Sequence, residues 1–236
     1  PDVDDDGVTF KSTYDGSYHR LTPETAVEIQ NSLGSDIQMA LDVCPPLPAE
    51  KEVIELAVER THLWAKRARR HFLNLKSELF EDQSQFGIVQ GGLDLNLRKK
   101  SAEQIVGIGF DGYAIGGLSV GETREEMLEP MSESIKYLPL ERPRYFMGLG
   151  DPAGLVEAIS CGVDMFDCVW PTRLARHGKI IDGANYLNIK NEKYKIDPKP
   201  LTDNCNCITC ISYSRSYINH LYRNEETSSW PYLVYH

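Results

Sequence analysis

Short apolar segments alternate with longer amphipathic segments along most of the chain, and this rhythm predicts alternating strands and helices. Each short segment ends at glycine, proline or a polar residue. The expected strands lie at residues 37–41, 86–89, 112–115, 145–147 and 163–170. A hairpin or extended loop is also expected at residues 10–19, around Asp15-Gly16.

The longer segments carry helix signals. Thr22 before Pro23 is typical of a helix start, and that helix should run to Gly34. Thr123 and Glu126 have the spacing of a capping box at the start of another helix. Further helices are expected at 97–106 and 152–161. Segment 50–79 has apolar residues at helical spacing, namely Ile54, Ala57, Val58, Trp64, Ala68, Phe72 and Leu75.

Five alternations of strand and helix predict parallel strands joined by crossover helices. A doubly wound sheet that binds a dinucleotide is disfavoured, because Gly148-x-Gly150 lacks the third glycine of that fingerprint. We therefore expect an α/β fold of the TIM type, a (β/α)8 barrel that is N-terminally incomplete in this chain. The chain does not begin with methionine, so we expect the first strands of the barrel to precede Pro1. The acidic residues that follow Pro1 are expected to form a solvated run; they are Asp2, Asp4, Asp5 and Asp6.

Parallel sheets place their functional residues at the carboxyl ends of the strands. Seven candidates therefore converge, namely Asp42, Cys44, Gln90, Gly116, Gly117, Met147 and Asp167. Asp167 is the most informative of them, because it lies within an apolar segment that also contains Met165, Phe166 and Val169. Burying an ionised carboxylate is costly unless it is paired or used. A strand-end aspartate that caps a nearby loop is the alternative interpretation.

The charge of the chain is unevenly distributed. The net charge is −10, which by itself argues against binding nucleic acid. Residues 173–223, however, contain nine basic and four acidic residues, a local charge of +5, which leaves −15 for the remainder. This basic segment begins with Arg173 and Arg176 and is typical of a face that contacts phosphates, although a solvated lysine-rich surface would look the same. We expect no membrane span, since no apolar segment is long enough.

Three of the six cysteines form a cluster with metal-binding spacing. Cys205, Cys207 and Cys210 suit one tetrahedral zinc ion, and the fourth ligand is expected to be His220 or His236. The other cysteines are scattered among apolar residues, so they do not indicate a disulfide framework. This usage favours a reducing, cytoplasmic compartment.

Several motifs in order resemble those of the tRNA-guanine transglycosylases, specifically the bacterial, queuosine-forming type. They include Asp42-Val-Cys-Pro-Pro46, Phe86-Gly-Ile-Val-Gln-Gly91, Tyr145-Phe-Met-Gly148, Asp164-Met-Phe-Asp-Cys-Val169 and the Cys-x-Cys-x-x-Cys cluster. The resemblance runs from about Gly7 to Arg223. It implies a TIM barrel with a zinc-binding insertion that exchanges guanine in the anticodon wobble position of GUN tRNAs for a 7-deazaguanine base.

The resemblance also assigns roles to residues. Asp167 matches the nucleophile that attacks the ribose C1′. The residues that match base-binding positions are Asp42, Cys44, Gln90, Gly117, Leu118 and Met147. Arg173 and Arg176 match residues that hold the anticodon loop, and Cys205, Cys207, Cys210 and His236 match the zinc ligands. The incoming base is expected to be preQ1, because Val120 should crowd a bulkier substituent and the Leu118 carbonyl could accept from an aminomethyl group.

The resemblance leaves several expectations about the whole protein. We expect a cytoplasmic homodimer whose residues 1–178 form a partial barrel and whose residues 179–236 form a zinc-binding, tRNA-contacting subdomain. The general acid–base aspartate of the family is expected upstream of Pro1, so residues 1–236 alone should catalyse poorly. The alternatives are a non-catalytic tRNA-binding accessory homologue, an archaeosine-type transglycosylase and a small-metabolite barrel enzyme. The carboxylates Asp42 and Asp167 argue against the accessory homologue, and the basic segment argues against the metabolite enzyme.

Overall fold

The structure is a computed structural model that describes residues 2–79, 83–183 and 185–236. The chain divides into two compact units, Pro1–Asp167 and Cys168–His236. The boundary expected from the sequence, after residue 178, would instead place the helix Trp170–Arg176 with the strands. As a boundary between functions, that expectation stays a prediction. None of the helices in the described part of the chain is long and apolar enough to cross a membrane.

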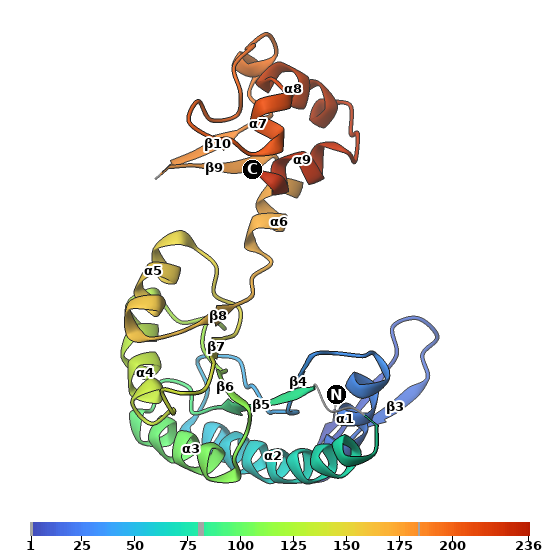
Figure 1. Cartoon of the computed structure of the whole chain (residues 1–236), viewed down its shortest axis with the longest axis vertical. Coiled ribbons are helices and arrows are strands. Elements are labelled where there is room, and N and C mark those ends of the chain that lie inside the picture. The colour runs from blue at the N-terminus through green and yellow to red at the C-terminus, as the bar shows by residue number, and fades with distance from the viewer. Residues whose placement is uncertain (1, 80–82, 184) are drawn as a thin grey trace. The chain divides into compact units, whose positions relative to one another are not determined.

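A five-stranded parallel sheet forms the centre of the first unit. Its spatial order, β4-β5-β6-β7-β8, is also the order along the chain, and every neighbouring pair is parallel. Figure 1 shows the sheet curling, so the first unit is a mixed α/β fold with a parallel half-barrel. The strands are β4 (Ile37–Met39), β5 (Ser84–Val89), β6 (Gly112–Ile115), β7 (Arg144–Phe146) and β8 (Met165–Phe166).

Helices connect these strands and cover the outer face of the curled sheet (Figure 1). The capping predictions are confirmed: Thr22 caps α1 with Pro23 in the first turn, and Thr123 and Glu126 form a capping box on α4. The helices of the first unit are α1 (Pro23–Ser32), α2 (Lys51–Leu79), α3 (Leu95–Ile108), α4 (Arg124–Lys136) and α5 (Pro152–Cys161).

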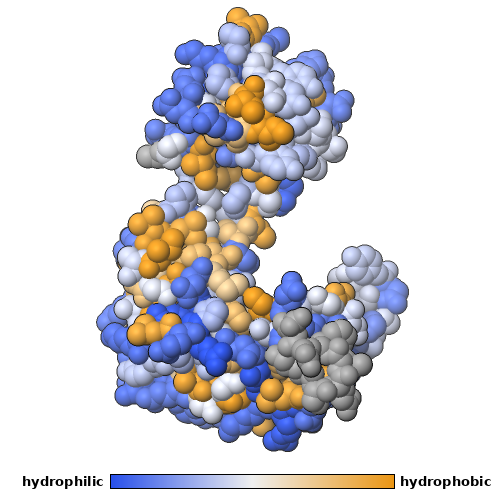
Figure 2. Space-filling view, in the orientation of Figure 1, coloured by the Kyte–Doolittle hydropathy of each residue, from blue (hydrophilic) through white to orange (hydrophobic). Residues whose placement is uncertain are grey.

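The main core lies between the sheet and these helices. The helical periodicity predicted for segment 50–79 is confirmed, because Trp64, Ala68 and Phe72 of α2 are buried. Ala68 and Phe72 pack with strand residues such as Val89 and Ile115 in one apolar cluster. Apolar side chains also gather on the surface of α5 (Figure 2), where Val156 and Ile159 are 68% and 58% exposed. Core packing therefore holds the strands in place. In the described part of the chain, the apolar face of α5 that carries Val156 and Ile159 stays exposed.

A small antiparallel sheet precedes α1. Strands β2 (Val8–Lys11) and β3 (Tyr18–Leu21) form the expected hairpin, and β1 (Asp2–Val3) pairs with β2. Strand β1 was not expected, because its two residues lie in the acidic run.

The acidic run is exposed to solvent, as expected, but it also has partners on α2. The carboxylate of Asp5 pairs with Arg60 at 2.9 Å, and the backbone carbonyl of Asp5 accepts from the Trp64 indole at 2.8 Å. Arg67 also pairs with Asp6, at 3.5 Å. Arg60, Trp64 and Arg67 lie at i, i+4 and i+7 on α2, so they share one face of that helix. That face holds the acidic segment against the helix.

The strand expected at 163–170 is much shorter in the structure. Only Met165 and Phe166 pair with β7, and Val169, expected to be buried, is 58% exposed. Residues from Trp170 onward form a helix, α6 (Trp170–Arg176), with Pro171 in its first turn. Proline suits that position because its missing N–H has no helical partner there. The apolar run was therefore a strand followed by a helix start.

The second unit is built around a separate core. It contains α6, an antiparallel hairpin of β9 (Lys179–Asp182) and β10 (Asn185–Asn188), and four short helical segments. Buried residues such as Ile180, Leu187 and Ile218 form its apolar cluster. The helical segments are η1 (Glu192–Tyr194), α7 (Ile208–Ser212), α8 (Arg215–Arg223) and α9 (Ser229–Tyr235).

Candidate active site and metal site

Two of the predicted base-binding residues, Asp42 and Gln90, are joined by a hydrogen bond at the carboxyl ends of β4 and β5. The Gln90 amide donates from Nε2 to Oδ2 of Asp42 at 2.6 Å. Gln90 is almost completely buried, at 1% exposure. Burial raises the pKa of Asp42, and the hydrogen bond from Gln90 opposes part of that rise. The pair leaves a carboxylate beside an amide oxygen at the edge of the sheet.

The glycines that follow β6 give Gln90 the space it occupies. Gly117 has a φ of +65°, and a Cβ at this position would lie 2.1 Å from Oε1 of Gln90. A Cβ on Gly116 would lie 2.8 Å from Nε2 of the same amide. Both distances are far shorter than real contacts, so a side chain at either position would displace Gln90. Glycine at 116 and 117 is therefore a requirement of the Asp42–Gln90 arrangement.

Arg98 of α3 ties these strand ends together, although the sequence analysis did not identify it. The side chain has 0% exposure, and burial lowers its pKa to about 9. Its Nη1 donates to the Gly116 carbonyl at 2.7 Å, its Nη2 to the Gly117 carbonyl at 3.0 Å, and its Nε to the Gly92 carbonyl at 2.7 Å. Helical spacing in the sequence could have indicated that Arg98 is buried. Position 98 lies three positions before Ser101 and seven before Ile105, on the buried face of α3.

The loop after Gly117 is fixed by a carboxylate. The backbone N–H groups of Ser119 and Val120 both donate to Glu122, the latter at 3.0 Å. The Leu118 side chain is 2% exposed and belongs to the core, so only the backbone of Leu118 is available to the site. The loop thus presents main-chain groups in a defined conformation.

Asp167 follows β8 and its side chain is exposed to solvent. Its Oδ1 accepts from the Tyr145 hydroxyl at 2.7 Å and from the Gly148 N–H at 2.8 Å. Burial raises the pKa of Tyr145, and the bond to Asp167 raises it further, so the phenol remains a donor. Tyr145 and Gly148 were quoted only as part of a motif, and their contact with Asp167 depends on tertiary structure.

The remaining candidates of the first unit lie near the same strand ends. Met147 directly follows β7, is half-buried, and donates its N–H to the Ile115 carbonyl at 3.3 Å. Cys44 lies two residues after Asp42 and is exposed. The structure therefore carries every candidate that the sequence placed at the strand ends on the loops that follow β4 to β8.

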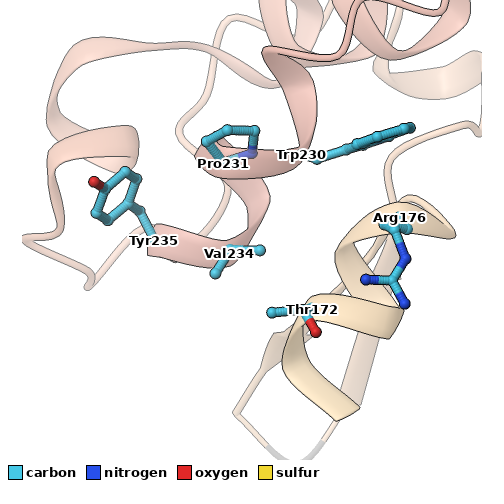
Figure 3. Close-up of a pocket in the computed structure, with 6 residues that line it drawn as sticks. All are labelled: Thr172, Arg176, Trp230, Pro231, Val234 and Tyr235. Carbon is cyan, nitrogen blue, oxygen red and sulfur yellow. The ribbon is translucent and has the colours of Figure 1, made fainter. Parts of the chain in front are cut away.

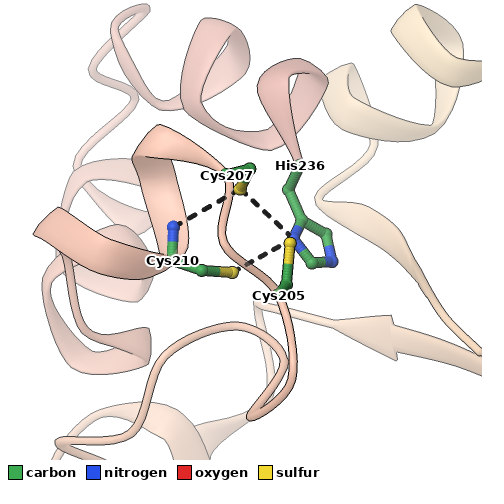
Figure 4. Close-up of side chains that lie close together, drawn as sticks. All are labelled: Cys205, Cys207, Cys210 and His236. Carbon is green, nitrogen blue, oxygen red and sulfur yellow. Dashed lines mark hydrogen bonds between the residues drawn. The ribbon is translucent and has the colours of Figure 1, made fainter.

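The second unit brings the predicted metal ligands together (Figure 4). The ligand atoms of Cys205, Cys207, Cys210 and His236 all lie within 4.8 Å of one another. Nδ1 of His236 is 3.2 Å from the sulfur of Cys210 and 3.7 Å from that of Cys207. In a tetrahedral zinc site a nitrogen and a sulfur ligand are about 3.5 Å apart, given Zn–S and Zn–N bonds of about 2.3 and 2.0 Å. The donor set and its spacing therefore fit one divalent metal ion.

The other ring nitrogen of His236 has partners typical of a metal ligand. Nε2 lies 3.1 Å from the Ile181 carbonyl and 3.1 Å from the Thr202 hydroxyl. Metal-binding histidines commonly donate their second N–H to such a carbonyl, which fixes the ring orientation. His220 is exposed on α8 and contacts Asn224 instead. Of the two histidines considered from the sequence, His236 is the one that lies with the cysteines.

The predicted tRNA-binding arginines, Arg173 and Arg176, are exposed on α6. Arg176 borders a largely apolar pocket of about 510 Å³ between α6 and α9 (Figure 3). The residues that line it are Thr172, Arg176, Trp230, Pro231, Val234 and Tyr235. Trp230 is 41% exposed, so a cation and an exposed aromatic ring border the same pocket.

Comparison with known proteins shows the family of the chain. The family model described as "Queuine tRNA-ribosyltransferase" matches residues 1–236. A relative from Halothermothrix orenii, named queuine tRNA-ribosyltransferase, is 46% identical over 235 residues, which is 100% of this chain and 61% of the relative. A relative of the same name from Thermotoga neapolitana is 52% identical over 219 residues, covering 93% of this chain and 58% of the relative.

A third relative, from Listeria monocytogenes, has the same name and is 46% identical over 235 residues. It too is covered for 61% of its length, so the chain spans about three fifths of the curated relatives it matches. The family model covers the whole chain, and the identities are well above those at which a family relation is uncertain. The chain belongs to the queuine tRNA-ribosyltransferase family.

Proposed function

We propose that the protein is a tRNA-guanine transglycosylase, which exchanges guanine at the wobble position of GUN tRNAs for preQ1 in queuosine biosynthesis. The observation that carries the proposal is the Asp42–Gln90 pair beside Gly117, at the same sheet edge that ends in Asp167. Family membership and the names of the relatives support it.

The pair has the hydrogen-bonding character that a guanine-like base requires. The amidine edge of guanine carries two kinds of N–H donor, and a carboxylate such as Asp42 can accept from both. The exocyclic oxygen of guanine needs donors, which the second N–H of the Gln90 amide and the Gly117 N–H would supply. Met147 would pack on the face of the base. A base can reach such a site only when it is unstacked, and an anticodon loop offers unstacked bases at low cost.

Asp167 is the proposed nucleophile. Its carboxylate oxygen attacks the ribose C1′ while the bond from C1′ to the guanine nitrogen breaks, and the electron pair of that bond leaves with the base. The departing base takes up a proton from a general acid, which the family resemblance places outside residues 1–236. A 7-deazaguanine base then attacks C1′, loses its ring-nitrogen proton and releases Asp167 as a carboxylate.

The second unit is proposed to hold zinc and to contact the tRNA. Cys205, Cys207, Cys210 and His236 would bind the ion, and four protein ligands leave no open position for a reacting water. The ion supplies structure, since it would fasten the end of α9 to the loop that precedes α7. Arg173 and Arg176 would hold phosphates of the anticodon loop.

The architecture of the whole protein is part of the proposal. The parallel half-barrel is proposed to belong to a closed (β/α)8 barrel, because its five strands curl and follow one another in chain order. A cytoplasmic homodimer is the proposed form. The family resemblance supports both the oligomer and the compartment.

Exchange of labelled guanine tests the function. The complete protein, including the upstream segment expected to carry the general acid–base aspartate, is incubated with a GUN-anticodon tRNA and radiolabelled guanine, and label retained in the tRNA is counted. Incorporation into the GUN tRNA, but not into a transcript whose wobble base is adenine, is the expected result. A complete protein that binds the tRNA yet incorporates no label would contradict the proposal.

A further inference from the structure

We propose that Arg98 is a positioning residue for base recognition, which acts by polarising the peptide group between Gly116 and Gly117. This inference rests on the proposed function, because it concerns the donor to the exocyclic oxygen of the base. It assigns a role to a side chain that lies behind the site and touches no substrate in the proposed arrangement.

The geometry that carries the inference is the direction in which Arg98 donates. Nη1 of Arg98 donates at 2.7 Å to the carbonyl of Gly116. That carbonyl belongs to the same peptide group as the N–H of Gly117, which is the proposed donor to the base. Arg98 thus lies at one end of a peptide group and the base would lie at the other.

The guanidinium of Arg98 polarises this peptide group. A donor on the carbonyl draws electron density toward the oxygen, and hydrogen bonds in such a chain strengthen one another. The Gly117 N–H therefore becomes a stronger donor. When the bond between ribose and base breaks, negative charge accumulates on the base, including its exocyclic oxygen. A preorganised donor that faces this charge stabilises the transition state.

Arg98 is fully buried, although no ion pair to it occurs among the described residues. In the part of the chain that the structure describes, no carboxylate lies within ion-pair distance of its guanidinium, and its four bonds all go to carbonyls. The charge of Glu122 offsets only part of the cost of burying Arg98, and burial remains the larger effect, so a cation at this position calls for a role that a neutral side chain could not fill. Neighbouring carbonyls compensate the charge only in part.

A purely structural role is the competing explanation, since Arg98 also connects the loops that hold Gln90 and Gly117. The two explanations predict different losses of affinity for different bases. Loss of structure would weaken the binding of any purine that fits. Loss of polarisation would weaken only bases whose exocyclic acceptor is strong, because a weak acceptor gains little from a better donor.

The test compares guanine with 6-thioguanine, which keeps the N–H edge read by Asp42 but replaces oxygen by sulfur, a weak acceptor. Dissociation constants of both bases are measured by calorimetry for the wild-type protein, Arg98→Met and Arg98→Lys. Arg69→Met is the matched control. Arg69 is also a buried arginine of the first unit, but it bonds Asp111 and the Gly109 carbonyl at the opposite ends of the strands.

Guanine affinity is expected to fall about tenfold in Arg98→Met, which is typical of one lost hydrogen bond, while 6-thioguanine affinity falls less than about threefold. Arg98→Lys, which keeps the charge, should lie between wild type and Arg98→Met. The ratio of the two constants should be unchanged in Arg69→Met.

Equal losses for both bases in the Arg98 variants would overturn the inference, as would unfolding of Arg98→Lys while Arg69→Met stays folded, since each result indicates a structural role alone. A wild-type protein that binds neither base would instead contradict the proposed function itself. The two failures are therefore distinguishable.

Discussion

Replacing Gly117 by alanine should damage the candidate site through one methyl group. The added Cβ would lie 2.1 Å from Oε1 of Gln90, so the amide must move away. Moving it breaks the 2.6 Å bond to Asp42, and a hydrogen bond to a charged group is worth about 1.5–3 kcal/mol. The backbone adds to this, because alanine in the left-handed conformation costs about 1–2 kcal/mol. Gly117→Ala should therefore lose roughly 2.5–5 kcal/mol of stability.

Gly109 offers a matched control for the backbone contribution. It has a φ of +85°, yet a Cβ there would meet no atom within 4 Å. Gly109→Ala should lose only the cost of the conformation, about 1–2 kcal/mol. Chemical denaturation measures both free energies of unfolding, and calorimetry measures guanine binding. Guanine affinity should fall roughly 10- to 150-fold in Gly117→Ala, the range equivalent to about 1.5–3 kcal/mol, and stay unchanged in Gly109→Ala.

One outcome would refute this reasoning directly. If Gly117→Ala binds guanine as tightly as Gly109→Ala does, the base does not depend on the position of Gln90. The Asp42–Gln90 pair would then be a structural feature of the strand ends, and base recognition would have to be sought elsewhere.

Four further predictions concern single side chains. Asp167→Asn should abolish the denaturation-resistant adduct with tRNA, which is seen as a shifted band on a denaturing gel. An undiminished band would show that Asp167 is not the nucleophile. Cys207→Ala should lose bound zinc in metal analysis while Cys161→Ala retains about one ion per chain, and equal zinc contents would contradict the site. Burial raises the pKa of Asp42, so the folded state favours the protonated form of this side chain. The ionised carboxylate therefore lowers the stability of the fold as the pH rises from the unfolded-state pKa of 3.8 through the raised folded-state pKa. Asp42→Asn should therefore raise the Tm at pH 7 but not below pH 3.8. A lower Tm of the variant at pH 7 would show that the ionised carboxylate stabilises the fold instead. PreQ1 should compete with labelled guanine far better than queuine does, whereas equal competition by queuine would show that Val120 does not restrict the pocket.

Local patterns in the sequence predict most of the fold of the first unit, because each element carries its own signals. The glycines and polar residues after the strands predict where the candidate site lies, and Asp42 and Gln90 do occur at neighbouring strand ends. The capping residues Thr22 and Thr123 predict helix starts for a similar reason, since a cap bonds backbone within its own turn.

Features that depend on distant contacts could not be predicted in the same way. Tyr145 bonds Asp167 across 22 positions, and Arg98 bonds the Gly117 carbonyl across 19. Neither partner is marked by local spacing. The strand expected at 163–170 failed for a related reason. An apolar run does not reveal where its backbone changes conformation, and here the chain turns from strand to helix before Trp170.

The donors around Asp167 make its two oxygens chemically different. Tyr145 and Gly148 both donate to Oδ1, and no described group donates to Oδ2. Oδ2 keeps its lone pairs free, so in the proposed reaction an ester with ribose would form through Oδ2. In that ester Oδ1 becomes the carbonyl oxygen and still accepts both bonds. These bonds withdraw electrons from the ester, which makes the carboxylate a better leaving group when the second base arrives. In the proposed reaction, the same two contacts would select the attacking oxygen and assist its release.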